Sequence, residues 1–252
     1  MRLTVLGAGT LVPHADRGAP GFVVNACGEN LLFDSGSGTL YRASRAGLNW
    51  QELSRLFYTH YHPDHTLDLV SILFAANYAP GAQRGDPLYV YGPAGLEDFY
   101  NKLSAAWPPV EPKGYRLSLC ELTPGEAVQG DAGWKVETAP MEHGDTGSLA
   151  YRVSDGSRSL VLSGDTQYCE ALVTISRGAD LLLCECSADD RHSVPGHLSP
   201  EGVARVAGES GVKKILLTHV YPPLDPNELA RRCEQMCEAA VEPARDLGVY
   251  EV

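Results

Sequence analysis

Three histidines and one aspartate lie within six residues of one another in the first third of the chain. They are His60, His62, Asp64 and His65, and they follow an apolar run. Residues two apart on an extended strand point to the same side, so His60 and His62 can bind one ion. Asp64 and His65 follow the bend that Pro63 imposes and can reach a second ion. Because imidazole and carboxylate groups are good ligands for divalent metals and are costly to bury unpaired, the segment predicts a metal site.

Three further candidate metal ligands lie downstream. His143, Asp165 and His219 each come after a short apolar run, as His60 does. Taken singly, a Ser-Gly-Asp segment is usually only a turn, and a Thr-His pair is usually only a strand end. Strand ends that meet at one edge of a sandwich can form a common site. Together with the first cluster, these positions favour metal binding over a purely structural interpretation.

Strands and helices in both halves of the chain must position these side chains. Short apolar runs that suit strands lie at Leu3–Leu6, Phe22–Val24, Asn30–Phe33, Leu56–Tyr58, Leu88–Tyr91, Trp134–Thr138, Leu149–Val153, Leu160–Leu162, Leu181–Cys184 and Ile215–Leu217. Helical patterns lie at Leu67–Tyr78, Gly95–Trp107, Pro200–Ser210 with Ser199 as its N-cap, and Asn227–Leu247. This alternation predicts an α/β layered fold. No linker is evident, so we expect one domain over residues 1–252.

Composition indicates the compartment. No apolar run approaches the roughly 20 residues that a bilayer span requires, so we expect no membrane association. The N-terminal apolar segment is too short, and too soon broken by Gly7, for a signal peptide. An odd count of seven cysteines fits reduced thiols and a cytoplasmic location. Cys233 and Cys237 lie four apart, but no second cysteine pair accompanies them, so we interpret them as ordinary thiols.

The charge balance argues against a broad grip on nucleic acid. The chain has 20 basic and 32 acidic residues, a formal charge of −12, and no lysine- or arginine-rich run. Proteins that hold nucleic acid over a wide surface usually carry a basic patch. A nuclease is still compatible with this composition, because bound cations supply local positive charge.

The motif His60-x-His62-x-Asp64-His65 resembles that of the metallo-β-lactamase superfamily. Within that superfamily the chain resembles the ribonuclease Z group, and the similarity runs from Leu3 to about Pro222. The matching segments are Gly7–Thr10 with Pro13 and Arg17, Phe33–Thr39, Ser163–Thr166 and Leu217–His219. The resemblance implies a four-layer αββα sandwich with a metal site on one edge.

The resemblance also implies a ligand set for two divalent ions. One ion takes His60, His62 and His143, the other takes Asp64, His65 and His219, and Asp165 bridges the two. The two ions share a bridging hydroxide that Asp64 and Asp165 orient. Zinc suits this ligation best, and manganese or iron is also compatible with it.

Two further residues match the ribonuclease Z group. In that group, a histidine at the position of His197 contacts the scissile phosphate, and a glutamate at the position of Glu185 supports it. A protonated imidazole can stabilise the developing charge and protonate the leaving oxygen, and a nearby carboxylate raises its pKa. The alternative interpretation makes His197 a helix-start histidine and Glu185 a strand-end charge.

The chain also departs from the group. Asp68 stands where the group usually has a glycine, so we expect the approach to the second ion to differ. Only 21 residues separate His143 from Asp165, enough for two strands and a turn containing Gly156. The long tRNA-binding arm of ribonuclease Z is therefore expected to be absent. These features predict a small phosphodiester or short nucleic acid as substrate, and not an extensive tRNA grip.

Three polar residues receive no role at the metal centre. His14 lies in the first glycine-proline loop and borders the expected pocket, whereas His192 is expected in a solvated loop. Asp34 is expected to accept backbone hydrogen bonds in its glycine turn.

Other functions remain open on the sequence alone. The same activated water can attack a carboxylic ester, a lactone, a thioester or a sulfate ester. A non-catalytic protein that binds metal or a small ligand is a further alternative. Related enzymes are often homodimers, so we also expect that a homodimer can form.

Overall fold

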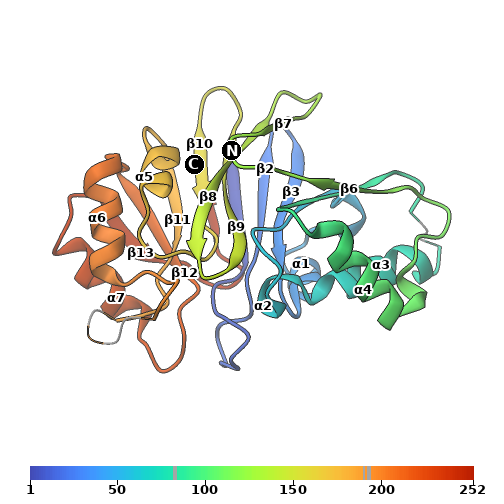
Figure 1. Ribbon diagram of the computed structural model, residues 1–252, viewed down its shortest axis with the longest axis horizontal. Helices are drawn as coiled ribbons and strands as arrows, with labels where there is room; N and C mark the ends of the chain where they lie inside the picture. The colour runs from blue at the N-terminus through green and yellow to red at the C-terminus, as the bar shows by residue number, and fades with distance from the viewer. Residues whose placement is uncertain (82–83, 190, 192–193) are drawn as a thin grey trace.

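Two seven-stranded sheets lie face to face in the computed structural model, which describes residues 1–81, 84–189, 191 and 194–252 (Figure 1). The first sheet has the strand order β14-β1-β2-β3-β4-β5-β6 and the second has the order β13-β12-β11-β10-β9-β8-β7. Strands of the first sheet are β1 (Arg2–Gly7), β2 (Gly21–Ala26), β3 (Glu29–Ser35), β4 (Arg55–Phe57), β5 (Leu88–Gly92), β6 (Leu117–Glu121) and β14 (Val249–Glu251). Strands of the second are β7 (Ala127–Gln129), β8 (Lys135–His143), β9 (Thr146–Ser154), β10 (Ser159–Leu162), β11 (Leu181–Glu185), β12 (Lys214–Thr218) and β13 (Ala240–Pro243).

Helices cover the outer face of each sheet (Figure 1). Those beside the first sheet are α1 (Thr39–Arg45), α2 (Pro63–Thr66), α3 (Asp68–Tyr78) and α4 (Leu96–Ala106), with 3-10 turns η1 (Trp50–Glu52) and η2 (Pro108–Val110). Those beside the second are α5 (Glu170–Ser176), α6 (Pro200–Ser210) and α7 (Pro226–Glu234). Among the described residues, no helix is long and apolar enough to cross a membrane.

The buried side chains show why the four layers form. On β3, Leu31 and Phe33 pack between the sheets, whereas Leu32 packs against the helices of the first sheet. On β11, Leu181 and Leu183 pack between the sheets, and the alternate residues pack against the other helices. Continuous apolar runs are expected of strands that are buried on both faces. The αββα sandwich predicted from the sequence is therefore confirmed.

The strand topology brings the candidate site residues to one edge. The strands β10, β11 and β12 run parallel, so their carboxyl ends lie at the same edge of the second sheet. Asp165, Glu185 and His219 lie at or just after these ends. The parallel strands β3 and β4 end at the facing edge of the first sheet, where His60 follows. The candidate site therefore spans the two sheets.

Most predicted elements are present, and one is wrong in its second half. The predicted helix Pro200–Ser210 has these bounds, with Ser199 at its N-cap position although the serine side chain makes no capping hydrogen bond. The predicted helix Asn227–Leu247 instead ends at Glu234, and β13 then pairs with β12. Pro243 disfavours helix only near the end of the predicted span, because proline cannot donate the hydrogen bond that a helix interior requires. The single domain over residues 1–252 stays a prediction.

The connection between β8 and β9 is a two-residue turn. His143 pairs with Thr146, and only Gly144 and Asp145 lie between the strands. The stretch from His143 to Asp165 consists of this turn, β9, a turn containing Gly156, and β10. The expected absence of a long arm at this place is confirmed.

Candidate metal centre

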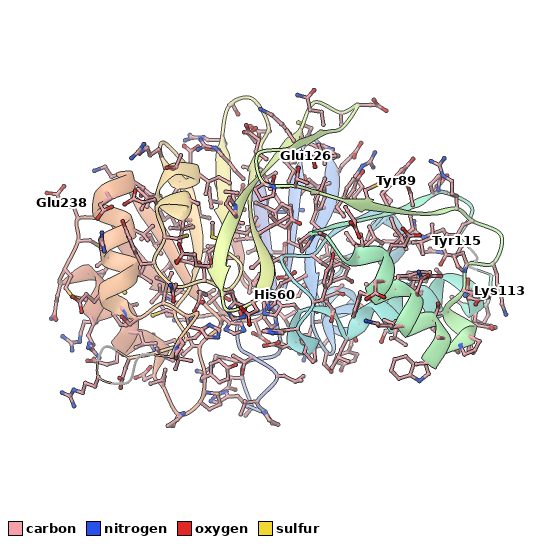
Figure 2. The ribbon with its side chains drawn as sticks, in the orientation of Figure 1. His60, Tyr89, Lys113, Tyr115, Glu126 and Glu238 are labelled. Carbon is pink, nitrogen blue, oxygen red and sulfur yellow. The ribbon has the colours of Figure 1, made fainter. Side chains whose placement is uncertain are left out.

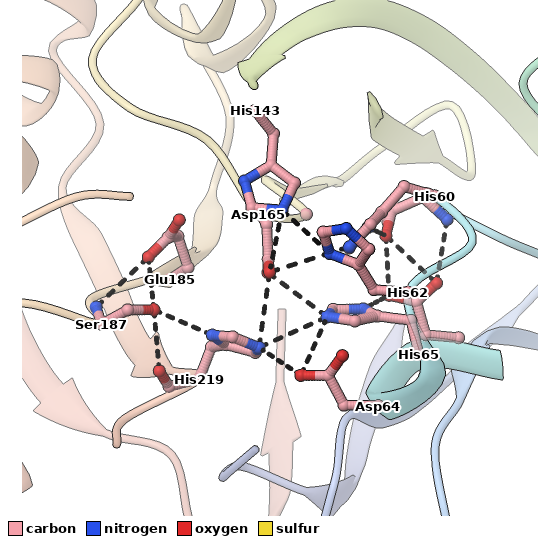
Figure 3. A network of polar contacts seen from close by, with 12 residues as sticks. His60, His62, Asp64, His65, His143, Asp165, Glu185, Ser187 and His219 are labelled. Carbon is pink, nitrogen blue, oxygen red and sulfur yellow. Dashed lines mark hydrogen bonds and ion pairs between the residues drawn. The ribbon is translucent and has the colours of Figure 1, made fainter. Parts of the chain in front are cut away.

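The first histidine cluster lies where β4 ends and α2 begins. His60 follows the end of β4, and His62 is the residue before Pro63, the first residue of α2. The His60 and His62 rings lie 4.6 Å apart. Asp64 and His65 lie within the short helix and are buried. The proline thus turns the chain after two extended residues, and four side chains converge on one place (Figure 3).

The second sheet contributes the other three predicted ligands. Their donor atoms and those of the first cluster form two groups, within each of which all donor atoms lie within 4.8 Å of one another. The groups are His60, His62, His143 and Asp165, and Asp64, His65 and His219. A further group of Asp165, His197 and His219 meets the same criterion. The structure therefore brings together all seven side chains that the sequence analysis selected.

Asp165 lies between the two main groups. Its Oδ1 is 3.4 Å from His65 Nε2, and its Oδ2 is 3.4 Å from His219 Nε2 and 3.8 Å from His60 Nε2 and His143 Nε2. Gly164 permits this placement, because its φ is +59° and an added Cβ would lie only 2.9 Å from Thr59 Cβ. The turn therefore needs a glycine, since only glycine combines this φ with so close an approach.

Partners outside the cluster fix the orientation of two histidine rings. His65 Nδ1 lies 2.8 Å from Asp34 Oδ2, and His143 Nδ1 lies 2.8 Å from the Gly196 carbonyl oxygen. A carboxylate and a carbonyl can only accept hydrogen bonds, so each Nδ1 carries the proton. When the ring is neutral, as a metal ligand must be, its Nε2 therefore holds a lone pair that points inward.

The same arrangement holds for two more rings. His60 Nδ1 lies 3.0 Å from Thr59 Oγ1, whose own proton is donated to Asp34. His219 Nδ1 lies 2.8 Å from Ser187 Oγ, whose proton is donated to Glu185 Oε2 at 2.7 Å. Both hydroxyl groups are thus free to accept from the ring. Metal-binding histidines commonly have such a partner on the second ring nitrogen.

The inward nitrogen atoms have the spacing of ligands that surround one cation. His65 Nε2 is 3.3 Å from His219 Nε2, and His143 Nε2 is 3.2 Å from His62 Nδ1. A tetrahedral zinc with bonds of about 2.0–2.1 Å sets its nitrogen ligands roughly 3.3 Å apart. His60 Nε2 and Asp165 Oδ1 are buried without a hydrogen-bond partner among the described residues. These side chains therefore fit divalent metal ions, and the cluster is a metal-binding one.

The charges of the cluster favour cation binding. Burial works against the charged form of Asp165, but His219 and His65 hold the pKa of this carboxyl well below its usual range. Burial likewise opposes ionisation of Asp64, and the His219 hydrogen bond with the charge of His65 lowers its pKa. Burial and the neighbouring His65 lower the pKa of His60. The centre therefore presents ionised carboxylates and a neutral His60.

His197 and Glu185 form an ion pair at the border of this cluster. His197 Nδ1 lies 2.9 Å from Glu185 Oε1. The His197 ring lies 4.8 Å from the His143 ring and is stacked on the His219 ring at 5.6 Å. Burial alone would lower the pKa of His197, but the Glu185 hydrogen bond and charge raise it. The His197–Glu185 pair can therefore present a protonated imidazole to a group bound at the metal cluster.

The sequence analysis missed two residues that support this arrangement. Ser187 contacts both Glu185 and His219, so it links the His197–Glu185 pair to the metal cluster. The Tyr221 ring stands edge-on to the His219 ring at 5.6 Å and to the His197 ring at 6.3 Å. Ser187 lies two residues after Glu185 and Tyr221 two residues after His219, but this spacing alone does not predict the contacts.

The residues without an assigned role also have defined places. Asp34 accepts from Thr59 N and from the Thr59 hydroxyl besides contacting His65, so it orients a neighbouring strand end and not the glycine turn alone. Asp68 Oδ2 accepts from Leu40 N at the start of α1, and neither main group includes it. His14 is exposed in the loop after β1. His192 lies outside the described residues.

Comparisons with known proteins agree with this geometry. The profile of the family described as "Beta-lactamase superfamily domain" matches residues 29–220. The ribonuclease Z of Methanosarcina acetivorans is 30% identical over 278 aligned positions, which cover 87% of this chain and 87% of that protein.

Two solved structures share the fold over nearly their full length. The short form of human tRNase Z has a TM-score of 0.80 and 25% identity, covering 100% of this chain and 99% of that one. The metallo-β-lactamase fold protein YhfI from Bacillus subtilis has a TM-score of 0.87 and 24% identity, covering 99% and 98%. With the metal-binding cluster described above, this chain belongs to the metallo-β-lactamase superfamily and, within it, to the ribonuclease Z-like metal-dependent hydrolases.

Proposed function

We propose that this protein is a phosphodiesterase that hydrolyses small phosphodiesters or short nucleic acids at a centre of two divalent ions, with zinc as the metal. The proposal rests on one observation: the His197–Glu185 ion pair lies beside the cluster of histidine and aspartate side chains that can bind metal. A neutral ester carries no charge before attack and therefore gains less from a cationic acid at this position. A phosphodiester gains from one, because negative charge accumulates on its leaving oxygen.

In this proposal the seven side chains divide between two ions. His60, His62 and His143 hold the first, Asp64, His65 and His219 hold the second, and Asp165 contacts both. The distances from Asp165 to histidines of both groups support its shared position. When bound, the ions supply Lewis acidity to the phosphoryl oxygens and make water acidic near neutral pH.

Side chains of the protein then stabilise the charge on the phosphoryl group and supply the proton to the leaving oxygen. Glu185 holds His197 through Nδ1, which leaves Nε2 for the substrate. His197 in its protonated form neutralises charge on the phosphoryl group and donates its Nε2 proton to the leaving oxygen. Asp64 and Asp165 orient the attacking water. The contact of His197 Nδ1 with Glu185 Oε1 at 2.9 Å supports this role over that of an eighth ligand, because a carboxylate partner favours the protonated ring and a protonated imidazole cannot ligate a metal.

The substrate class is inferred from the relatives and from the loops. The names ribonuclease Z and tRNase Z support a nuclease or phosphodiesterase. The two-residue turn between β8 and β9 and the formal charge of −12 support a substrate smaller than tRNA.

A substrate panel tests the proposal on the zinc-loaded protein. It contains bis(4-nitrophenyl) phosphate, a dinucleotide, a precursor tRNA, 4-nitrophenyl acetate, 4-nitrophenyl sulfate, a lactone and a thioester. We expect kcat/KM to be highest for the two small phosphodiesters and to be lost on chelation. A higher value for any carbon or sulfur ester would refute the proposal, and absence of all turnover at full metal occupancy would favour a binding protein.

Location and assembly are secondary inferences. All seven cysteines are free thiols, which supports a cytoplasmic location. The homodimer expected from the resemblance stays a prediction, and sedimentation of the purified protein tests it.

A further inference from the structure

A groove of about 370 Å³ lies between the loop that joins β1 to β2 and helix α1. In the described part of the chain, its lining contains three arginines, Arg17, Arg42 and Arg45. The other lining residues are His14, Ala15, Asp16, Gly18, Tyr41, Asp246 and Leu247. This concentration of arginine is unexpected in a chain with a formal charge of −12.

The groove lies close to the metal centre. Arg42 Nη2 donates to the Ala19 carbonyl oxygen at 2.9 Å, and the next residue, Pro20, lines the small space beneath His65 and Asp165. An added Cβ on Gly36 would lie 1.9 Å from the Asp64 carbonyl oxygen and 2.7 Å from Ala19 Cβ. Contacts through Ala19 and Gly36 therefore connect Arg42 to the segment that carries Asp64.

The figures agree with this placement. The loop between β1 and β2 projects from the same edge of the sandwich (Figure 1) at which His60 is labelled (Figure 2). Val220, the residue after His219, donates its N–H to the Ala8 carbonyl oxygen at the base of this loop. The loop is therefore bordered by the metal centre and by the groove, and a substrate of modest length can contact both.

The acidic groups of the groove are already partly engaged. Asp246 Oδ1 accepts from Ala8 N at 2.9 Å and Oδ2 accepts from Gly18 N at 2.8 Å. The second oxygen also lies 3.9 Å from Arg42 Nε. Asp246 thus fastens the two ends of the loop and offsets part of the charge of Arg42. Asp16 is exposed, and the solvent screens its charge.

The arginines keep donors for a ligand. Arg17 is held by one contact, from Nη2 to the Leu224 carbonyl oxygen at 3.4 Å. Arg42 Nη2 donates to the carbonyl oxygens of Ala19 and Ser37, and no hydrogen bond from its Nη1 is found among the described residues. Arg45 is exposed, and no hydrogen bond or ion pair to it is found in the part of the chain that the structure describes.

We propose that this groove binds a second phosphate of the substrate, adjacent to the phosphodiester that is hydrolysed at the metal centre. Guanidinium groups match the geometry of phosphate oxygens and form strong charge-assisted hydrogen bonds with them. Tyr41, whose side chain is 69% exposed, offers a ring face on which a base or sugar can stack. This inference rests on the proposed phosphodiesterase function, and it narrows the substrate to molecules with two phosphates.

The second phosphate can belong to a nucleotide chain or to the end of a small molecule. Three substrates of the zinc-loaded protein separate these sources: TpT, with one phosphate; pTpT, with an added terminal phosphate; and TpTpT, with an added internal phosphate. We expect kcat/KM for pTpT to exceed that for TpT by at least about tenfold, as one charge-assisted hydrogen bond predicts. An equal gain for TpTpT assigns the groove to nucleotide chains, and no gain for either substrate overturns the inference.

A pair of matched variants locates the effect. Arg45→Glu reverses the charge of an exposed residue in the groove, so it tests binding without disturbing the contacts of Arg17 and Arg42. Arg2→Glu makes the same change at an exposed residue at the opposite end of β1. We expect the pTpT preference to fall about tenfold in Arg45→Glu and to persist in Arg2→Glu. A preference that survives in Arg45→Glu contradicts the assignment.

A binding measurement separates failure of this inference from failure of the proposed function. Thymidine 3′,5′-bisphosphate contains no phosphodiester, and its affinity for the zinc-loaded protein is measured by calorimetry against that of thymidine 5′-monophosphate. Tighter binding of the bisphosphate that is lost in Arg45→Glu supports the groove even if bis(4-nitrophenyl) phosphate is not hydrolysed. Equal binding of the two nucleotides overturns the groove even if that diester is a good substrate.

Discussion

The Nδ1 atom of His65 lies 2.8 Å from Oδ2 of Asp34, which joins the helix start of the histidine motif to the end of β3. The Asp34 backbone has a φ of +53°, a conformation that aspartate tolerates better than most residues. The same carboxylate accepts from Thr59 N, one residue before His60. Asp34 therefore orients two parts of the metal cluster without belonging to either main group.

Substitution of Asp34 should weaken metal binding. Asp34→Asn retains a side chain that tolerates the positive φ but loses the charge that orients His65, so we expect metal affinity to fall about 10–100-fold. Competition with a coloured chelator measures this affinity. Asp68→Asn provides the control, because Asp68 contacts Leu40 and Ser71 and lies in neither main group. An unchanged affinity in Asp34→Asn would show that His65 needs no such partner.

Removal of Asp165 should remove metal and activity together. Its two oxygens face histidines of both groups, so Asp165→Ala takes one ligand from each ion. We expect fewer than two ions per chain by elemental analysis. Turnover of bis(4-nitrophenyl) phosphate should fall on the order of a thousandfold, since metal-ion stabilisation amounts to several kcal/mol. Asp145 is exposed in the turn after β8, so the control variant Asp145→Ala should keep both ions. Full metal content in Asp165→Ala would show that Asp165 does not contact both ions.

His197 should affect turnover without affecting metal content. In His197→Ala the proton donor is lost, and we expect kcat to fall about 10²–10⁴-fold with both ions retained. Loss of the ions in this variant would instead identify His197 as a ligand. A substrate with a good leaving group, such as a 4-nitrophenyl ester, should be affected less than a dinucleotide, because it needs less protonation.

The pH profile tests the partnership of His197 with Glu185. Because Glu185 raises the pKa of His197, the protonated form persists above the ordinary histidine value and is lost as pH rises through the raised pKa. We therefore expect kcat to fall at alkaline pH as His197 loses its proton. In Glu185→Gln this fall should move to lower pH, since the raising charge is gone. A fall that stays at the same pH would exclude the ion pair from the reaction.

Chelation should lower the thermal stability of the protein. Four of the predicted ligands come from the segment after β4 and three come from the ends of second-sheet strands, so bound ions join the two sheets. We expect the Tm to fall on metal removal and to recover on addition of zinc, because a ligand that binds only the folded state stabilises it. Scanning calorimetry measures this change; an identical Tm with and without metal would mean that the cluster binds no ion tightly.

The sequence predicted those parts of the site that local chain geometry determines. His60, His62, Asp64 and His65 are adjacent in the chain, so extended backbone and one proline place them. His143, Asp165 and His219 were found because each follows an apolar strand. Ser187 could not be found in this way, because its contact with His219 depends on the parallel pairing of β11 with β12.

The errors have equally specific causes. The helix predicted over Asn227–Leu247 combined α7 with a strand whose identity comes from pairing with β12. The absence of a basic run in the sequence hid the arginine groove, because Arg17, Arg42 and Asp246 are distant in the chain and meet only in the fold. Tertiary contacts of this range leave no periodicity in the sequence.

The two-residue turn after His143 has a consequence for how this scaffold can acquire new specificity. Both strands of the β8–β9 hairpin are paired from Lys135 and Ser154 up to that turn, and each also pairs with a further strand, β7 or β10. Residues inserted between Gly144 and Asp145 would begin one residue after His143, beside the candidate metal centre. Surface hairpin tips tolerate such additions well. The turn is therefore a natural place to graft a recognition module that would redirect the enzyme toward larger RNAs.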